Sequence, residues 1–380
     1  MKAKPIKVMT VVGTRPEIIR LSRIINHLQN SKSIEHILVH TGQNYDYSLN
    51  EIFFEQLQVP EPDYYLEAAG ENASQTIGQI IIKIDILLEK INPDAFLVLG
   101  DTNSCLSAIP AKKRKIPIFH MEAGNRCFDQ RVPEEINRKL IDHLADINLT
   151  YSDISREYLL REGIPPDQVI KTGSPIMEIL NYYQEDIDNS KILQDLKLKE
   201  NNYFLVSAHR EENVNNPKNF SDLIDSLSVI AETYSYPVIV STHPRTKKLL
   251  KAHNIKSNHL IKWLEPQGFF AYNKLQKKAF VVLSDSGTIS EESSILNFKA
   301  LNIRKSHERP EAMEEAAVMM VGLKKERILQ AIEIVKYQDT EKRNFTPVAD
   351  YSKANVSLKV ERILLSHIDF INSVVWRKES

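Results

Sequence analysis

The arrangement of apolar residues along the chain constrains its fold more than any other feature. Short, β-branched apolar runs alternate with longer stretches, such as 74–91, whose apolar residues recur at helical spacing. Regular alternation between the two patterns is typical of parallel sheets covered by helices on both faces, so the predicted class is α/β. The predicted strands are Ile6–Val12, Glu35–His40, Ala95–Leu99, Ile116–His120, Ile147–Thr150, Val169–Lys171, Tyr203–Ser207, Val238–Ser241, His259–Trp263, Phe280–Ser284, Ala300–Ile303 and Val318–Val321.

The length of the chain calls for more than one such sheet. A single domain of about 150 residues is an ordinary size, and the chain has 380 residues. It turns polar between Pro175 and Asn202, and a fresh apolar run follows. We therefore predict two doubly wound, Rossmann-like domains, at 1–174 and 175–363, which face a ligand cleft at the carboxyl ends of their strands. The pattern leaves open whether a C-terminal helix at 364–380 completes the first domain.

The charge balance excludes one class of function. The chain carries 49 Lys and Arg residues against 50 Asp and Glu residues, a formal net charge of -1. Proteins that neutralise nucleic-acid phosphates carry an excess of positive charge, so we expect no nucleic-acid partner.

No apolar run approaches the roughly 20 residues of a membrane span, and the stretch MKAKPIKVMTVVG lacks a small-residue cleavage signal. We therefore expect a cytoplasmic protein with no membrane partner.

Cysteine and histidine usage argues against a metal centre. Cys105 and Cys127 cannot form a disulfide framework or a Cys-x-x-Cys metal site. His209 and His243 each follow a predicted strand, but no third histidine or cysteine has a helpful spacing. An arginine closely follows each of them, which indicates an anionic ligand rather than a metal ion.

The end of the first predicted strand is a candidate anion site. Gly13 permits a tight turn, Thr14 is suited to cap a helix, and Pro16 is suited to its first turn. Arg15 is thereby expected beside a helix N-terminus, where an anion is stabilised. The alternative is a plain capped helix with a surface arginine.

Three carboxylates follow strands or open a helix in the first domain. Asp101 and Glu122 come after predicted strands, and Glu134 opens a predicted helix that also carries Arg138. Taken singly, Asp101 is a helix cap, and Glu134 with Arg138 is an ordinary helical ion pair. Taken together, crowded carboxylates at one rim raise each other's pKa, which suits general acid and base catalysis near neutral pH.

A turn of small residues in the second domain is a candidate phosphate site. Ser286 and Gly287 follow a predicted strand and lead into a helix, where backbone N–H groups and the helix dipole favour an anion. Glu291 or Glu292 on that helix is placed to reach ribose hydroxyls. The turn is neither a GxGxxG motif nor a P-loop, so no dinucleotide or ATP cofactor is expected.

Seven motifs in order resemble one known family. The motifs are GTRPE, GDTN, HMEAGNR, PEEINR, HREEN, SDSG with a following EE, and ERPE, and they extend from Gly13 to Glu311. They resemble the non-hydrolysing UDP-N-acetylglucosamine 2-epimerases. The resemblance implies a GT-B-like architecture, a homodimer, and catalysis by anti elimination of UDP to a glycal followed by re-addition. It implies no redox cofactor.

The resemblance also assigns roles to single residues. It implies catalytic roles for Asp101, Glu122, Glu134, Arg138 and His209, without deciding which acid removes the C2 proton. Tyr272 matches the aromatic residue that stacks on uracil, Glu292 the ribose-binding glutamate and Arg309 the loop arginine. Together with the candidates above, the predicted UDP-sugar contacts are Arg15, Arg20, His209, His243, Tyr272, Ser286, Gly287, Glu292 and Arg309.

The chain departs from the family pattern at several of these motifs. Arg20 stands where the family commonly has lysine, which favours charge stabilisation there over proton transfer. The motifs SDSGT and HMEAGNR replace the commoner SDSGG and HVEAGLR. These departures are similar to the branch that makes N-acetyl-L-fucosamine precursors. The substrate is therefore either the UDP-N-acetylglucosamine and UDP-N-acetylmannosamine pair or a UDP-2-acetamido-2,6-dideoxy-L-hexose pair.

Three other functions fit a similar architecture. The first is a GT-B glycosyltransferase with a UDP-sugar donor, which has no need of three carboxylates around C2. The second is a hydrolysing epimerase, which releases UDP and N-acetylmannosamine. The third is a non-catalytic sensor of nucleotide sugars.

Overall fold

The chain folds into two compact units, which we describe separately. The computed structural model describes residues 4–43, 48–208, 210, 213, 216–242, 250, 258–306 and 308–378, with the backbone alone at 48–50. Unit 1 comprises Met1–Asn181 with Ser352–Ser380, and unit 2 comprises Tyr182–Tyr351. Within the described residues, no helix is long and apolar enough to span a membrane.

Unit 1 is built on a parallel sheet with the strand order β3-β2-β1-β4-β5-β6-β7. The strands are β1 (Ile6–Val12), β2 (Ile34–His40), β3 (Tyr64–Tyr65), β4 (Ala95–Leu99), β5 (Ile118–Ala123), β6 (Ile147–Thr150) and β7 (Val169–Lys171). The chain winds outward in one direction from β1 and in the other from β4. The sheet therefore has its topological switch point between β1 and β4, where doubly wound sheets bind ligands.

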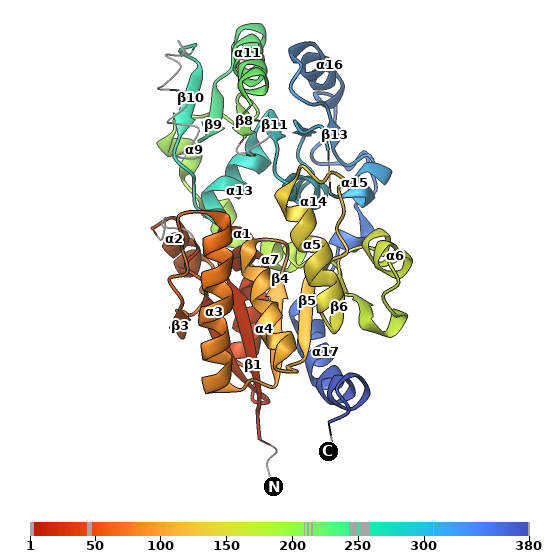
Figure 1. Ribbon diagram of the computed structural model, residues 1–380. Coiled ribbons are helices and arrows are strands. Elements are labelled where there is room, and N and C mark those ends of the chain that lie inside the picture. The colour runs from red at the N-terminus through yellow and green to blue at the C-terminus, as the bar shows by residue number, and fades with distance from the viewer. Residues whose placement is uncertain are drawn as a thin grey trace. The chain divides into compact units, whose positions relative to one another are not determined.

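Helices cover both faces of this sheet. They are α1 (Arg15–Gln29), α2 (Ser48–Gln56), α3 (Ala73–Ile91), η1 (Asn103–Ser107), α4 (Ala108–Lys113), α5 (Pro133–Leu144), α6 (Asp153–Arg161), η2 (Pro166–Gln168), α7 (Ile176–Tyr182), α17 (Val356–Phe370) and η4 (Ile371–Val375). Figure 1 shows α3, α4 and α5 along one face of the sheet. The C-terminal α17 packs against α1, and His27 Nε2 lies 2.7 Å from Glu361 Oε2. The end of the chain therefore completes unit 1.

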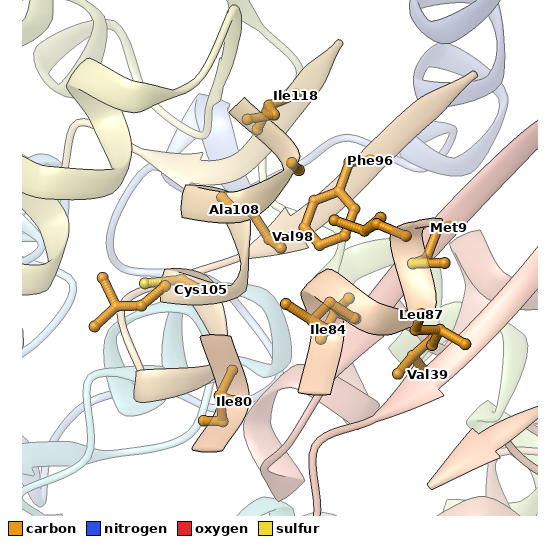
Figure 2. Packing of buried hydrophobic residues seen from close by; sticks show 14 of the residues in the cluster. Met9, Val39, Ile80, Ile84, Leu87, Phe96, Val98, Cys105, Ala108 and Ile118 are labelled. Atoms are coloured by element: carbon orange, nitrogen blue, oxygen red, sulfur yellow. The ribbon is translucent and has the colours of Figure 1, made fainter. Parts of the chain in front are cut away.

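The core of unit 1 follows from helical spacing on α3. The Asn72 side chain accepts a hydrogen bond from the backbone of Gln75 and caps the helix, which ends at Asn92 in the left-handed conformation. Ile80, Ile84 and Leu87 fall on one face of α3 and are buried. Figure 2 shows them in the same buried cluster as Phe96 and Val98 of β4. Each such aliphatic side chain contributes about 1.5–3 kcal/mol when fully buried.

Unit 2 has a second parallel sheet with the order β10-β9-β8-β11-β12-β13. The strands are β8 (Phe204–Ser207), β9 (Val238–Ser241), β10 (Ile261–Leu264), β11 (Val281–Ser284), β12 (Ala300–Asn302) and β13 (Met319–Met320). The helices with described bounds are α8 (Gln184–Asn189), α9 (Ile192–Asp195), α11 (Pro217–Tyr234), α13 (Phe269–Lys278), α14 (Thr288–Leu296), α15 (Pro310–Glu314), α16 (Lys325–Val335) and η3 (Ala349–Tyr351). The switch point of this sheet lies between β8 and β11.

The predicted α/β class is confirmed, as are the two Rossmann-like sheets of a GT-B-like protein. β1, β4, β6, β7 and β9 have the bounds expected from sequence. The short strand β3 was not expected, because two residues carry no periodic signal. β5 continues to Ala123, beyond the predicted end at His120, so Glu122 lies inside the strand and not in the loop after it.

Candidate active site

A buried glutamate joins the two loops at the switch point of unit 1. Glu17 is 1% exposed and accepts hydrogen bonds from the backbone N–H groups of Gly13, at 2.5 Å, and Thr14, at 2.9 Å. Its other oxygen accepts from the hydroxyls of Thr102 and Ser104. Burial raises the pKa of Glu17, and the four donors oppose that rise. The loop after β1 and the loop after β4 are thus held as one piece.

Gly13 lies at a close approach of three loops. A Cβ atom at this position would lie 2.2 Å from Thr41 Oγ1 and 2.9 Å from Gln43 Nε2, so a side chain does not fit. Arg15 follows as the first residue of α1, half-buried, with its guanidinium 5.6 Å from the ring centre of Phe53. The predicted Arg15 is therefore at a helix N-terminus, as the motif indicated.

Asp101 is held by α5. Arg138 Nε donates to Asp101 Oδ2 at 2.7 Å, and Asn137 Nδ2 donates to the Asp101 carbonyl at 2.8 Å. The Arg138 side chain is 5% exposed and also donates to Glu135 at 3.0 Å. Burial by itself raises the pKa of Glu135, but hydrogen bonds from Cys127 and the charge of Arg138 outweigh it and lower that pKa. Glu135 therefore stays ionised and fixes Arg138 for its contact with Asp101.

Glu122 is presented by a strained backbone. It has a φ of 64°, which is rare for a residue other than glycine, and the pairing of β5 with β6 shifts register between Met121 and Ala123. Strain of this kind costs about 1–3 kcal/mol and concentrates at functional sites. Arg20 Nε lies 3.4 Å from Glu122 Oε2, and Asn125 Nδ2 donates to Oε1 at 3.3 Å.

Glu134 lies in the first turn of α5 and is half-buried. It shares this helix with Arg138, whose partners include Asp101 and Glu135. The structure thus brings Asp101 together with Arg138, and Glu122 together with Arg20. It connects Glu134 to this group through α5.

In unit 2, too, a buried carboxylate joins the two loops at the switch point of the sheet. Asp285, 0% exposed, accepts hydrogen bonds at one oxygen from the backbone N–H of Arg210, at 2.9 Å, and from Asn213 Nδ2, at 3.0 Å. Asp285 therefore fixes the start of the loop after β8 against the loop after β11. His209 and His243 lie outside the described residues, so their predicted roles stay predictions.

The loop after β11 leads directly into α14. The Ser286 N–H donates to Ser284 Oγ at 3.0 Å, and the hydroxyls of Ser286 and Thr288 lie 2.9 Å apart. A Cβ atom on Gly287 would come within 3.2 Å of a Glu308 carboxylate oxygen. Ser286 and Gly287 thus stand at the N-terminus of α14, a position that favours an anion.

Arginines surround this loop in unit 2. Arg304 Nη1 donates to Glu308 Oε1 at 2.7 Å, and Arg210 Nη2 lies 3.8 Å from the same oxygen. Arg309 Nη2 lies 3.5 Å from Glu291 Oε2, and both side chains are buried. The predicted Arg309 is therefore fixed beside α14.

The predicted nucleoside contacts lie on two adjoining helices. Glu292 on α14 accepts a hydrogen bond from Gln276 Nε2 of α13 at 2.7 Å. Tyr272, half-buried, lies one turn before Gln276 on α13. A buried hydrogen bond thus holds the residue predicted for ribose against α13, the helix that carries the residue predicted for uracil.

Two structural residues were missed from sequence. Glu17 and Asp285 stand inside the recognised motifs, but we assigned them no role. A glutamate three residues after a capping threonine is a recognisable signal for Glu17. The partners of Asp285 lie more than 70 residues away, at separations of 75 and 72, and no local pattern announces them. In the described part of the chain, no cluster of three or more His, Cys, Asp and Glu side chains is arranged to hold a metal ion.

Comparison with known proteins identifies close relatives over most of the chain. The family model described as UDP-N-acetylglucosamine 2-epimerase matches residues 26–365. A solved structure of UDP-N-acetylglucosamine 2-epimerase from Rickettsia bellii is 50% identical, with a TM-score of 0.92 over 99% of this chain and 100% of that one. The structure of the Methanocaldococcus jannaschii enzyme in complex with UDP-GlcNAc and UDP is 36% identical, with a TM-score of 0.88 over 95% of this chain and 100% of that one. A UDP-2,3-diacetamido-2,3-dideoxy-D-glucuronate 2-epimerase from Pseudomonas aeruginosa is 30% identical over 86% of this chain and 91% of its own length.

Proposed function

The chain belongs to the UDP-N-acetylglucosamine 2-epimerase family, and from that premise we propose that it is a non-hydrolysing isomerase that inverts C2 of a UDP-2-acetamido sugar. One observation carries the proposal beyond the family assignment. Asp101 and Glu122 stand at the strand ends of unit 1, and each faces a buried arginine, Arg138 at 2.7 Å and Arg20 at 3.4 Å. Carboxylates held in this way are suited to move a proton at a carbon atom.

The reaction needs a base and an acid on opposite faces of C2. One carboxylate of unit 1 removes the C2 proton, the C–H electrons form a C1=C2 double bond, and the C1–O bond to UDP breaks. UDP then re-adds through a β-phosphate oxygen, and a second protonated carboxyl group returns a proton to the opposite face of C2. More than one carboxylate is therefore required, and Asp101, Glu122 and Glu134 are the candidates. The strained φ of 64° at Glu122 favours a direct role for this residue.

Unit 2 is proposed to bind UDP. The small-residue loop of Ser286 and Gly287 at the N-terminus of α14, with Arg309 beside it, is suited to the diphosphate. Charge develops on this group as it leaves C1, so donors aimed at it lower the barrier. Glu292, which accepts a hydrogen bond from Gln276 at 2.7 Å, is proposed to bind a ribose hydroxyl. Tyr272 is proposed to stack on uracil. Arg15 in unit 1 and the histidines His209 and His243 are proposed as further contacts of the anionic substrate.

We propose UDP-N-acetylglucosamine and UDP-N-acetylmannosamine as the first substrate pair to test. A UDP-2-acetamido-2,6-dideoxy-L-hexose pair is the second candidate, because one departure from the family pattern touches the proposed acid. Asn125 stands where the family commonly has leucine, and it donates to Glu122 at 3.3 Å and accepts from Ser155 Oγ at 3.2 Å. This hydrogen bond changes the surroundings of the proposed acid relative to the family pattern, as a different sugar would require.

We also propose that the enzyme acts as a homodimer in the cytoplasm. Two helices of unit 1 expose aliphatic side chains at a spacing of four, with Ile82 56% and Ile86 64% exposed on α3, and Ile136 56% and Leu140 52% exposed on α5. α4 packs against both helices. Exposed apolar rows of this kind are typical of protein interfaces. Light scattering after gel filtration, with Ile86→Lys and Leu140→Lys as variants, tests the dimer.

The decisive experiment follows C2 by NMR in deuterated water. Purified protein is incubated with UDP-N-acetylglucosamine alone and, separately, with candidate 6-deoxy sugars. An epimerase gives the C2 epimer with deuterium at C2, and UDP and free sugar do not accumulate. Release of UDP with N-acetylmannosamine indicates a hydrolysing enzyme. Binding of a UDP-sugar without exchange contradicts the proposal and favours a glycosyltransferase, if an acceptor restores turnover, or a non-catalytic sensor.

A further inference from the structure

Unit 1 holds a second group of charged side chains next to the proposed acids. We call it the His120 cluster and define it as His120, Arg126, Asp142 and Glu162. The side chains of His120, Arg126 and Asp142 are 1%, 0% and 0% exposed. Arg126 donates to Asp142 at 2.6 Å and, through two nitrogens, to both oxygens of Glu162 at 2.9 and 2.6 Å. Sequence analysis assigned no role to any of these residues.

Both ring nitrogens of His120 face hydrogen-bond acceptors. Nδ1 lies 2.9 Å from Asp142 Oδ1, and Nε2 lies 2.9 Å from the carbonyl oxygen of Gly100. A carbonyl oxygen and an ionised carboxylate accept hydrogen bonds but cannot donate them. A neutral imidazole has one N–H group, so one of its nitrogens would point a lone pair at an oxygen. Only the doubly protonated ring satisfies both contacts.

Asp142 is ionised, so its carboxyl group has no proton to donate to Nδ1 of a neutral His120. It also accepts the Gly124 N–H at 3.2 Å, besides the hydrogen bond from Arg126. The Arg126 guanidinium and the Gly124 N–H favour the ionised carboxylate whatever the state of His120, and the pKa of Asp142 is lowered although burial by itself raises it. With Asp142 and Glu162 negative and Arg126 positive, the cluster is neutral only when His120 carries the second positive charge.

His36 provides an internal comparison. It is also buried in unit 1, at 8% exposure, but its Nε2 lies 2.8 Å from the Thr10 hydroxyl and its Nδ1 lies 3.2 Å from Gln29 Oε1. A hydroxyl can donate, so a neutral His36 satisfies both contacts. Burial lowers the pKa of His36 to about 4, in agreement with a neutral ring. The two histidines thus differ in the chemistry of their partners and not in their depth.

The contacts of His120 tie together the elements that carry the proposed acids. Its Nε2 binds the carbonyl of Gly100, the residue before Asp101, and its own strand β5 carries Glu122 two residues later. Its Nδ1 binds Asp142 on α5, the helix whose Arg138 holds Asp101 at 2.7 Å. The His120 ring therefore connects its own strand, β5, to the end of β4 and to α5.

We propose that His120 is held as a buried imidazolium cation and is a positioning residue for Asp101 and Glu122. The positioning role rests on the epimerase function proposed above, whereas the charge state does not. The ring fixes the residue before Asp101 and helix α5 to the strand that carries Glu122, and its positive charge balances the negative charge of the cluster itself. Further titratable groups in the described part of unit 1 also face the cluster. Cys105 lies in the field of Asp142 as well as of Asp101 and Glu17, and the half-exposed His143 has its Nε2 3.3 Å from Glu162.

The charge state is tested without reference to activity. Protein labelled with nitrogen-15 at histidine is examined by NMR at about pH 7, where an unperturbed histidine is mostly neutral. His120→Asn and His36→Gln assign the two signals. We expect two protonated ring nitrogens for His120 and one protonated ring nitrogen for His36 in the same sample. An unprotonated ring nitrogen in His120 overturns the proposal.

Asp142→Asn provides the second test. It removes one negative charge and supplies an amide that can donate to Nδ1, so the cluster becomes neutral with a neutral His120. We expect the His120 ring to lose one proton in this variant while His36 is unchanged. A ring that stays doubly protonated overturns the assignment of Asp142 as its counter-ion.

The positioning role is tested by separating kcat from KM. Residues that orient an active group through hydrogen bonds typically contribute 10–100-fold, so we expect His120→Asn to lower kcat by about 10–100-fold with little change in the Kd of UDP. His36→Gln, a buried control in the same sheet, should keep the wild-type kcat. A wild-type kcat in His120→Asn overturns the positioning role. A doubly protonated His120 in a protein that turns over no UDP-sugar upholds the charge state and overturns both the proposed function and the positioning role.

Discussion

Arg20 Nε lies 3.4 Å from a carboxylate oxygen of Glu122, and the two side chains are only 4% and 14% exposed. The guanidinium also lies 5.6 Å from the ring centre of Tyr151. A nearly buried ion pair of this kind leaves an uncompensated charge when one partner is removed. Arg20 therefore fixes the Glu122 side chain in place, a role that does not require Arg20 to exchange a proton.

Arg20→Ala and Arg20→Lys should separate charge from geometry. We expect Arg20→Ala to lower the free energy of unfolding by about 3 kcal/mol and to abolish most turnover. Arg20→Lys retains the charge but loses the planar contact with Tyr151, so its effect should be intermediate. Urea denaturation and steady-state kinetics measure both effects. Arg161→Ala, which breaks an exposed pair with Glu157, is the control and should change stability by less than about 0.5 kcal/mol. Equal stability of Arg20→Ala and wild type contradicts the prediction.

Carboxamide variants should separate chemistry from binding. Asp101→Asn, Glu122→Gln and Glu134→Gln preserve shape but cannot accept a proton from carbon, so we expect kcat to fall by about 10²–10⁴-fold for each group that transfers a proton. UDP affinity, measured by calorimetry, should stay near wild type because the proposed nucleotide contacts lie mainly in unit 2. Asp153→Asn, at a 75% exposed side chain, is the matched control. If all three variants turn over substrate at the wild-type rate, the assignment of the acids is wrong.

The sheets could be predicted from sequence because strand ends leave a local signal. The apolar runs of β1 and β4 stop at Gly13 and Gly100, and the polar residues after them mark the switch point. Parallel sheets gather such loops at one edge. Arg15 and Asp101 were therefore found without any knowledge of their partners.

The partners themselves could not be predicted, because they are set by tertiary packing. Helical spacing predicts Glu134 as a neighbour of Arg138, but it gives no sign that Arg138 also binds Asp101, 37 residues earlier. The strained φ at Glu122 arises from a register shift between two strands and has no sequence signature. Glu17 reaches Thr102 across 85 residues of chain. Local patterns thus locate the site, and long-range contacts determine its geometry.

Glu292 should contribute affinity and not chemistry. A charge-assisted hydrogen bond contributes about 1.5–3 kcal/mol, so Glu292→Gln should weaken UDP binding by about 10–100-fold and leave kcat at saturation nearly unchanged. Gln276→Ala removes only the partner that orients Glu292 at 2.7 Å, so its effect should be smaller but in the same direction. Calorimetry with UDP measures both. Wild-type affinity in Glu292→Gln would place the ribose contact elsewhere.

The pH dependence of stability should reveal the buried Glu17. Burial raises the pKa of Glu17 above its ordinary value of 4.5, so the native state holds this proton more tightly than the unfolded chain does. Its contribution to stability is complete below 4.5 and is lost as the pH rises through the raised native pKa. We therefore expect the wild type to lose stability relative to Glu17→Gln as the pH rises through this window. Ser104→Ala removes an opposing donor and should enlarge the loss. Parallel stability curves for wild type and Glu17→Gln in urea titrations contradict the prediction.

His36 and His40 should give a pH dependence of the opposite sign. Burial lowers the pKa of each from 6.5 to about 4, so between these two pH values the unfolded chain binds protons at these histidines and the native state does not. Their contribution to stability is complete above 6.5 and is lost as the pH falls toward about 4. Each histidine should therefore lower the free energy of unfolding by up to about 1.4 kcal/mol for each pH unit as the pH falls across that interval. The neutral form is built into the structure, because His40 Nδ1 accepts the Gly42 N–H at 3.0 Å and cannot do so when protonated. His36→Gln and His40→Gln should each flatten the acid limb of the stability curve, measured by urea denaturation. An acid limb as steep as that of the wild type in both variants would show that other groups govern acid unfolding.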